Sequence, residues 1–240
     1  MQIECWSDFV CPFCYIGKRR LENALNRFGH RDKVKMTFKS FELAPALPRD
    51  GNPDTYDMLA AKYGISREQA KATTANVANQ ARQVGLTFDF DRAIQTNTFD
   101  AHRLAHFAAQ QGKQTEWVER LFRAHFTEGK HLGNRDELVA LAAEVGLDPD
   151  QVRPVLEKGA HAAEVRKDEQ EASSLGVRGV PFFVFNRQFA VSGAQPEEVF
   201  LEALRKAWGE SRPFEVVGGD ADAACTDDGC IVPNGKGPNP

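Results

Sequence analysis

The stretch Cys11-Pro12-Phe13-Cys14 lies at the boundary between two sequence patterns. The apolar segment before it, Gln2-Ile3-Glu4-Cys5-Trp6, is typical of a β-strand. The pattern after it repeats on one helix face at Leu21, Ala24, Leu25 and Phe28, and Gly29 predicts the helix end. We therefore expect both cysteines at a strand-to-helix turn, with Pro12 at the first helical position, where its missing N–H costs nothing.

This position suits a reactive cysteine, and we expect Cys11 to be exposed and Cys14 to be buried. A Cys11 thiolate at the helix cap would accept hydrogen bonds from the amides of Phe13 and Cys14 and would lie at the positive end of the helix dipole. Both effects lower the pKa of Cys11, so Pro12 and Phe13 are candidate pKa-tuning residues. Cys14, one turn further on, can attack a mixed disulfide formed on Cys11. The stretch predicts dithiol–disulfide exchange with these two cysteines as catalytic residues.

A single CxxC also occurs as half of a zinc site or as a local structural disulfide. A zinc site needs a second ligand pair about 12–20 residues away. No Cys or His follows Cys14 until His30, and the other cysteine pair, Cys225 and Cys230, lies far down the chain. We therefore predict redox catalysis and no metal site.

A second informative stretch is Gly179-Val180-Pro181 followed by four apolar residues, 182–185. These predict a buried strand, with a turn at 186–188 and a hairpin partner at 189–191. A proline is tolerated at the start of a strand because no ladder hydrogen bond is lost there. From the dipeptide alone, an ordinary trans proline is the more frequent form.

The middle of the chain has a helical character. Lys33 to Ser40 alternates as a half-buried strand, but no strand signal follows between about residues 54 and 174. Helix starts are predicted at the capping box Ser66…Gln69, at Asn134…Glu137 and at Asp148-Pro149. The sequence therefore predicts a helical domain of about 120 residues inserted between two strand-containing parts.

The pair of CxxC and Val-Pro before a strand resembles the thioredoxin superfamily, and the helical insertion resembles its DsbA family. The resemblance implies an α/β thioredoxin-like fold with an inserted all-helical domain. It also implies that the Val180–Pro181 bond is cis and that Val180 and Pro181 bind an extended substrate peptide through their backbone.

Finer motifs are similar to those of the FrnE-like members of the DsbA family. They are the segments 7–17 (SDFVCPFCYIG), 97–104 (NTFDAHRL), 124–129 (AHFTEG), 179–183 (GVPFF) and 191–196 (VSGAQP). FrnE-like proteins with an extra CX4C pair in the tail are the best match, which Cys225 and Cys230 fit. We expect thioredoxin-like parts at 1–50 and 175–212, the helical insertion at 51–174 and a flexible tail at 213–240.

One position departs from the thioredoxin pattern. Related enzymes often place a buried carboxylate six residues before the first active-site cysteine, as a proton acceptor beneath the second. Cys5 stands there in this chain, and we expect it to be a buried, inert thiol. Asp8 and Glu4 are then candidate acceptors of the Cys14 proton, and we expect water to take it rather than either carboxylate.

Two histidines, His102 and His106, are spaced i, i+4 on a predicted helix but lack the glutamate of a His-Glu-x-x-His motif. We expect core or solvent-facing histidines rather than metal ligands. The resemblance implies that the segment 97–104 faces the redox site, where His102 could lend positive charge near Cys11.

The composition limits the possible functions. A chain of 240 residues with 42% hydrophobic residues can bury a full core, and a net charge of −4 without a basic run argues against nucleic acid. We see no transmembrane stretch, so we expect no membrane contact. Glu4 and Asp8 interrupt any signal-peptide pattern, which favours a cytoplasmic protein; a mature chain whose signal has been removed is the alternative.

The tail beyond Gly218 is rich in glycine, proline and aspartate, and such a composition cannot build a core. The Asp-Gly turn between Cys225 and Cys230 allows these thiols to approach each other. The pair is either a structural disulfide, two idle thiols or a second redox pair that exchanges with Cys11 and Cys14.

Three function classes remain. The first is a thiol–disulfide oxidoreductase or protein disulfide isomerase that uses no cofactor, acts on protein thiols or disulfides and is recycled by a thiol reductant or a thioredoxin-type system. The second is a glutathione-dependent isomerase or transferase of the 2-hydroxychromene-2-carboxylate isomerase or kappa-class type. Those enzymes typically carry serine in place of Cys11, and Cys14 argues against them. The third is a non-catalytic binding or zinc protein using all four paired cysteines.

Overall fold

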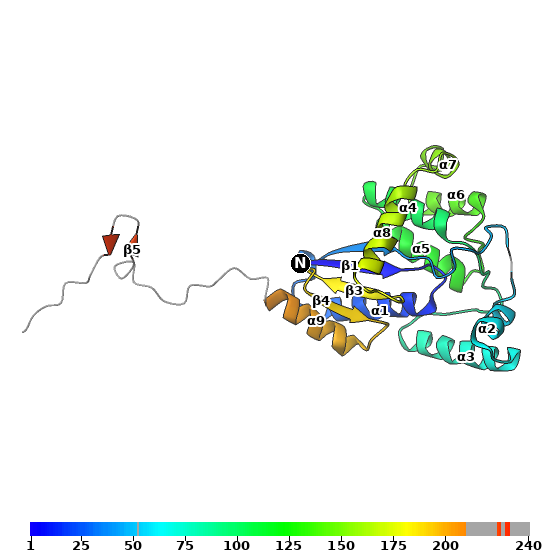
Figure 1. Cartoon of the computed structure of the whole chain (residues 1–240), viewed down its shortest axis with the longest axis horizontal. Coiled ribbons are helices and arrows are strands. Elements are labelled where there is room, and N and C mark those ends of the chain that lie inside the picture. Colours follow the sequence, from blue (N-terminus) through cyan, green and yellow to red (C-terminus); the bar gives the residue numbers. More distant parts are fainter. Residues whose placement is uncertain (52, 210–224, 227–228, 231–240) are drawn as a thin grey trace, which may run out of the picture.

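A four-stranded mixed sheet forms the centre of the molecule (Figure 1). The computed structural model describes residues 1–51, 53–209, 225–226 and 229–230. The strands are β1 (Gln2–Ser7), β2 (Lys35–Ser40), β3 (Phe182–Phe185) and β4 (Phe189–Ser192), in the order β2-β1-β3-β4. β1 pairs with β2 in parallel and with β3 in antiparallel orientation, and β3 and β4 form a hairpin.

Helices cover both faces of this sheet and form a layer beyond it. α1 (Pro12–Asn26) and α9 (Glu197–Gly209) pack together on one face, and α8 (Ala162–Ser174) packs on the other (Figure 1). The remaining helices lie between β2 and α8 in the chain: α2 (Thr55–Tyr63), α3 (Arg67–Gln83), α4 (Phe99–Gln110), α5 (Gln114–Phe126), α6 (Arg135–Glu144) and α7 (Pro149–Glu157). The architecture is therefore an α/β sheet with a long helical insertion between its two strand-containing parts, as the sequence predicted.

Alternation along β1 assigns its side chains to the two faces. Ile3 and Cys5 are buried on the side of α1 and α9, where Phe183 of β3 meets Phe200 of α9 edge to face at 4.9 Å. Trp6 faces the opposite way and packs in a smaller apolar cluster with Ala172 of α8. Successive residues of β1 therefore pack into two different apolar clusters, one on each face of the sheet.

Most of the predicted element boundaries are confirmed. Ser66 and Gln69 form the reciprocal capping box of α3, and Asn134 and Asp148 cap α6 and α7 through their side chains. The predicted helix stop at Gly29 is wrong, because α1 ends at Asn26 and the chain bends into a short 3₁₀ helix, Arg31–Lys33, before β2. β2 consequently begins at Lys35 rather than Lys33.

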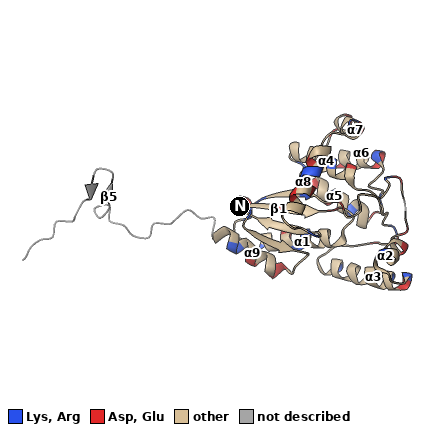
Figure 2. Cartoon of the chain, in the orientation of Figure 1, with Lys and Arg blue, Asp and Glu red and all other residues tan. Residues whose placement is uncertain are grey.

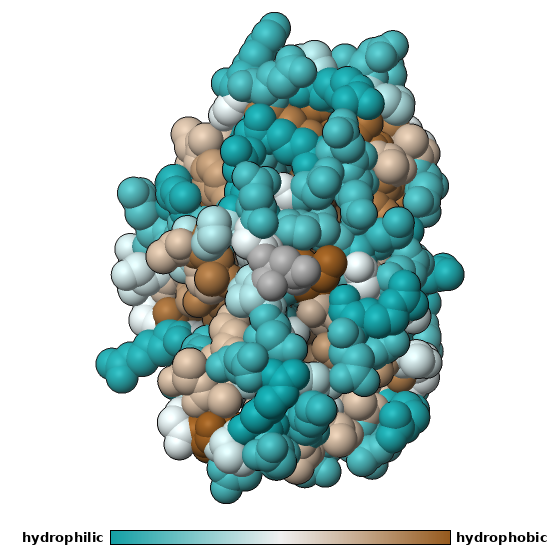
Figure 3. Space-filling model, turned by 90° about the vertical axis from the view of Figure 1, so that its right-hand side faces the viewer, coloured by the Kyte–Doolittle hydropathy of each residue, from teal (hydrophilic) through white to brown (hydrophobic). Residues whose placement is uncertain are grey.

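The surface carries charges of both signs. Figure 2 shows basic and acidic residues interspersed on the outer helices, and hydrophilic residues cover most of the face drawn in Figure 3. Within the described residues, no helix is both long enough and apolar enough to cross a membrane.

One carboxylate attaches α1 to the insertion. Glu119 of α5 accepts hydrogen bonds from the Tyr15 hydroxyl at 2.7 Å, from Arg19 at 2.6 Å and from the Lys18 ammonium. The Lys18 side chain is only 2% exposed, and Glu22 at 2.6 Å is its other partner. The Tyr15 ring stacks on Phe122 of α5 at 4.8 Å. These contacts fix the helix that begins at the CxxC against α5.

Glu119→Gln should therefore destabilise the protein by about 1–3 kcal/mol, because it leaves the buried Lys18 charge with a single carboxylate partner. Urea unfolding measures this loss. The control is Glu198→Gln, which removes an exposed partner of Arg27 and should change stability by less than about 0.5 kcal/mol. Equal effects of the two changes would contradict the role assigned to Glu119.

Candidate active site

The CxxC lies at the turn between β1 and α1, as predicted. Cys11 is the N-cap of α1 in an extended conformation, and Pro12 is the first helical residue. The Cys11 amide donates to the Asp8 carbonyl at 3.1 Å, and the Cys14 amide donates to the Cys11 carbonyl at 3.1 Å. Both cysteines are free thiols. The turn thus presents a dithiol at the positive end of a helix of 15 residues.

Two expectations about Cys11 are corrected. Its sulfur does not accept hydrogen bonds from the amides of Phe13 and Cys14, since α1 has no side-chain cap. The Cys11 thiol instead lies 3.6 Å from the Val180 carbonyl, a donation that only the protonated thiol can make. The side chain is also buried rather than exposed, at 4% exposure. The packing of the Val180 loop over the cap explains both differences.

Cys14 is buried at 1% exposure, which suits a resolving thiol. Burial raises the pKa of the Cys14 thiol well above its ordinary value, and the adjacent Cys11 sulfur adds to the rise, whereas a hydrogen bond from the backbone of Asp8 opposes it. Burial likewise raises the pKa of the Cys5 thiol. Cys5 is therefore the buried, inert residue that the sequence predicted.

The Val180–Pro181 bond is cis, as the resemblance implied. The Val180 carbonyl lies beside the Cys11 thiol, so the structure brings Cys11 and this loop together from opposite ends of the fold. α1 approaches the loop at Gly17, where a Cβ would lie 3.1 Å from the Pro181 ring and 3.3 Å from the Phe183 ring. Glycine at this position permits the close packing of helix and loop.

Apolar side chains lie beside the cysteines. Phe13, between the two cysteines, is 40% exposed. Leu43 is also exposed, and its amide donates to the Asp8 carboxylate at 2.7 Å, which fixes the chain after β2 beside the CxxC turn. Leu43 was not predicted as a site residue. The one sequence signal for it is an apolar residue shortly after a strand.

A group of buried polar side chains next to the CxxC turn was also only partly anticipated. Asp8, His102 of α4 and His125 of α5 are all buried. The Asp8 carboxylate approaches His102 Nε2 at 3.4 Å, and the His102 ring lies tilted against the Phe9 ring with the centroids 4.6 Å apart. Of the two positions expected for His102, core or solvent-facing, the structure shows the core. Its contact is with Asp8; a contact with Cys11 is a prediction that the structure does not test.

Glu4, named in the sequence analysis as a possible proton acceptor, is excluded. It lies on the β1 face opposite to Cys5, where it pairs with Arg187 at 2.7 Å and with Lys39 at 3.9 Å. Of the two carboxylates considered as proton acceptors, Asp8 is the one that lies at the CxxC turn.

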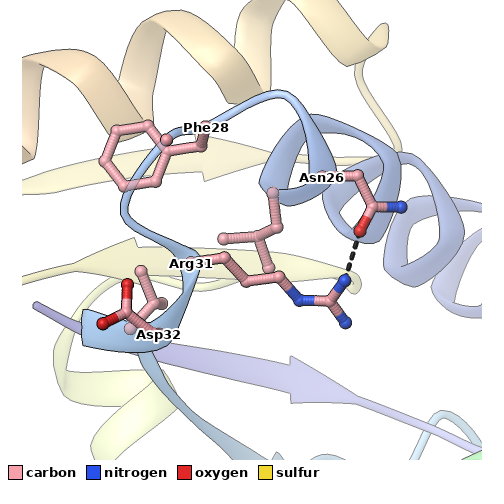
Figure 4. Close-up of a pocket in the computed structure, with 7 residues that line it drawn as sticks. Asn26, Phe28, Arg31 and Asp32 are labelled. Carbon is pink, nitrogen blue, oxygen red and sulfur yellow. Dashed lines mark hydrogen bonds between the residues drawn. The ribbon is translucent and has the colours of Figure 1, made fainter.

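The described residues include no group of three or more His, Cys, Asp or Glu side chains placed to hold a metal ion. A cavity of about 640 Å³ lies at the C-terminal end of α1, opposite to the end that carries Cys11. In Figure 4, Arg31 donates to Asn26 at the edge of this cavity, and Phe28 and Asp32 lie around it. The cavity is therefore remote from the dithiol.

The second cysteine pair is described only in its backbone. Cys225–Thr226 (β5) pairs antiparallel with Gly229–Cys230 (β6), and Cys225 lies directly opposite Cys230. Residues 227–228 and the rest of the predicted tail lie outside the described residues. Opposite residues in such a ladder have Cα atoms about 4.5–5.5 Å apart, a spacing that disulfides use.

Known proteins resemble the chain over most of its length. The family model described as a DSBA-like thioredoxin domain matches residues 2–205. A probable DsbA oxidoreductase from Streptomyces coelicolor is 46% identical, with a TM-score of 0.85 over 97% of this chain and 99% of its own. A 2-hydroxychromene-2-carboxylate isomerase (18% identity, TM-score 0.65, 88% of this chain and 95% of its own) shares the fold. So does the cytosolic disulfide reductase DsbM from Pseudomonas aeruginosa (17% identity, TM-score 0.61, 88% of this chain and 100% of its own).

Gly17→Val should displace the Pro181 loop, because the added methyl groups have no room between α1 and the loop. We expect a loss of about 1–3 kcal/mol in the free energy of unfolding, together with faster alkylation of Cys11 as the loop moves away. The control is Gly29→Val, where a Cβ would meet nothing within 4 Å. If both variants behave like the wild type, the close approach is not a constraint.

His125 should make the protein sensitive to mild acid. Burial lowers the pKa of His125 to about 4 in the folded protein, whereas a histidine in the unfolded chain titrates near 6.5. Between these values only the unfolded chain binds the proton, so stability falls as pH decreases from about 6.5 to 4, by about 3 kcal/mol. His125→Leu should remove this fall in urea unfolding at pH 7 and pH 4.5. An unchanged pH dependence would contradict the assignment.

Proposed function

Because the chain belongs to the family of DSBA-like thioredoxin domains and is 46% identical to a probable DsbA oxidoreductase, we propose that it catalyses disulfide exchange on protein substrates through Cys11 and Cys14. The observation that supports this proposal best is the placement of the two thiols. Cys11 caps α1 beside the Val180 carbonyl, and Cys14 lies one turn deeper in the core. A dithiol at a helix N-terminus is suited to exchange rather than to structural bridging.

In the proposed reaction, Cys11 attacks a substrate disulfide as a thiolate. A Cys11–substrate disulfide forms, and the first substrate sulfur leaves with the electron pair of the broken bond. Cys14 then loses its proton and attacks Cys11, which releases the second substrate sulfur and oxidises the pair. A thiol reductant or a thioredoxin-type protein returns the pair to the dithiol. Isomerisation follows when the released substrate thiolate attacks another disulfide of the same substrate.

The surroundings of the dithiol suggest how a protein substrate binds. Phe13 and Leu43 offer exposed apolar contact area beside the cysteines, and the backbone at Val180 and Pro181 lies next to the Cys11 thiol. We propose that an extended substrate segment lies along the Val180 loop with an apolar side chain against Phe13. Pro12 and Phe13 then influence the reactivity of Cys11 through the shape of the cap.

The finer assignments also belong to this proposal. We place the chain in the FrnE-like subgroup, with Cys225 and Cys230 as a second redox pair in the tail. We assign residues 1–50 and 175–212 to the thioredoxin-like unit, 51–174 to the insertion and 213–240 to the tail. The proposed location is the cytoplasm; the P. aeruginosa reductase that shares the fold is described as cytosolic.

Insulin reduction and the refolding of scrambled ribonuclease test the proposed function. Cys11→Ser should abolish both activities, because no other thiol occupies the cap of α1. Cys14→Ser should trap a mixed disulfide with the substrate, since attack on Cys11 then fails. Cys5→Ala is the matched control, as it removes a buried thiol outside the pair, and it should keep both activities.

The variant Cys225→Ser/Cys230→Ser tests the tail in the same two assays. It should retain part of the insulin reduction while the ratio of isomerase to reductase activity changes. Full activity of Cys11→Ser would show that the tail pair is an independent centre. Glutathione-dependent isomerisation of a small substrate without any disulfide exchange would favour the alternative class.

A further inference from the structure

The exchange reaction raises a question of proton transfer at Cys14. This thiol is buried and its pKa is raised, so it must give its proton to another group before it can attack Cys11. Cys5, which takes the usual carboxylate position, is itself a thiol with a raised pKa. Glu4 lies on the other face of the sheet. The acceptor must therefore come from elsewhere.

Asp8 is placed to serve this purpose. Its carbonyl accepts the Cys11 amide at 3.1 Å, which fixes Asp8 at the CxxC turn, and its backbone lowers the pKa of Cys14 against the larger rise that burial causes. Its side chain is 1% exposed. Oδ2 accepts the Leu43 amide at 2.7 Å, but Oδ1 finds no hydrogen-bond partner within the described part of the chain. A buried carboxylate oxygen without a partner is costly, which points to a function for it.

His102 is the group that faces this oxygen. Its Nε2 lies 3.4 Å from Asp8 Oδ1 and likewise has no hydrogen-bond partner among the described residues. The carboxylate of Glu42 also interacts electrostatically with His102, so two acidic groups lie near this imidazole. His125 differs, because burial lowers its pKa to about 4 and it stays neutral near pH 7.

A polar route leads from His102 towards the surface. His102, Ser7 and Ser40 line a cavity of about 10 Å³, a volume that suits one water molecule, and the Ser7 hydroxyl has no partner among the described residues. The Ser40 hydroxyl lies 3.2 Å from His106 Nε2. The His106 side chain is 19% exposed and lies 3.1 Å from Asp168.

We propose that Asp8 and His102 take up the proton that Cys14 releases and that Ser7, Ser40 and His106 carry it to solvent. The inference rests on the proposed exchange function. The Cys14 S–H bond breaks, its proton passes to the Asp8–His102 pair, and its electron pair forms the bond to Cys11. The bond between Cys11 and the substrate breaks with its electrons on the substrate sulfur, which is thereby reduced.

The groups that act on this pair come from all the elements packed around it. Cys11 and Cys14 of the CxxC turn interact with the Asp8 backbone, and His125 of α5 interacts electrostatically with Asp8. Glu42, after β2, acts on His102, and Glu42 is itself held by Arg166 at 2.6 Å. The pH dependence of the second step therefore depends on all of these groups together.

Single-turnover reduction of a fluorescent peptide disulfide separates the two steps. The first, concentration-dependent phase reports the attack of Cys11, and the second, concentration-independent phase reports the attack of Cys14. Asp8→Asn and His102→Gln should slow the second phase by about 10- to 100-fold near pH 7 and change the first by less than about twofold. The rise of the second phase with pH should move to higher pH, because solvent must then remove the proton.

Glu4→Gln is the matched control, since it makes the same chemical change on the other face of β1, and both phases should stay as in the wild type. Urea unfolding establishes whether each variant is folded. If Asp8→Asn does not fold, His102→Gln alone tests the inference. A second phase with wild-type rate and pH profile in a folded variant would overturn the inference. The absence of a first phase in the wild-type protein would instead contradict the proposed exchange function.

Discussion

The contact between α1 and the Pro181 loop is the constraint on which the arrangement of the site depends. Gly17 and Pro181 are more than 160 residues apart in the chain, yet a Cβ at Gly17 would already crowd the proline ring. This contact brings the Val180 carbonyl to the Cys11 thiol. The helical insertion leaves the sheet after β2 and returns through α8 before the loop, so its packing must preserve this approach. Glu119 of α5 helps to preserve the approach, because it binds three residues of α1: Tyr15, Lys18 and Arg19.

The parts of the fold that follow local rules could be predicted from the sequence. Pro12 at the first helical position, the Ser66–Gln69 capping box and the hairpin after Pro181 each depend on a few neighbouring residues. The hairpin turn at 186–188 places Asn186 and Arg187 at positive φ, and the Gln188 amide donates across it to the Phe185 carbonyl at 2.9 Å. The cis form of Val180–Pro181 required the resemblance to a family, because the dipeptide by itself favours trans.

The electrostatic details could not be predicted in the same way, because they depend on how distant helices pack. Burial of Cys11 and the contact of Asp8 with His102 require α4 and the Val180 loop to lie against the CxxC turn. No short-range sequence pattern predicts this packing of distant segments. The exclusion of Glu4 is an exception: it alternates with Cys5 along β1, so strand geometry alone places it on the opposite face.

Burial of the resolving thiol has two consequences that the rest of the site must reconcile. A raised pKa keeps Cys14 protonated while Cys11 waits for a substrate, so the pair does not react prematurely with small oxidants. The same burial slows the direct removal of the proton by solvent when attack is required. A buried carboxylate and imidazole satisfy both demands, since they accept a proton without admitting solvent to the dithiol. An Asp8 oxygen without a hydrogen-bond partner in the described part of the chain is costly for stability on its own. The proposed transfer of the Cys14 proton gives this cost a function.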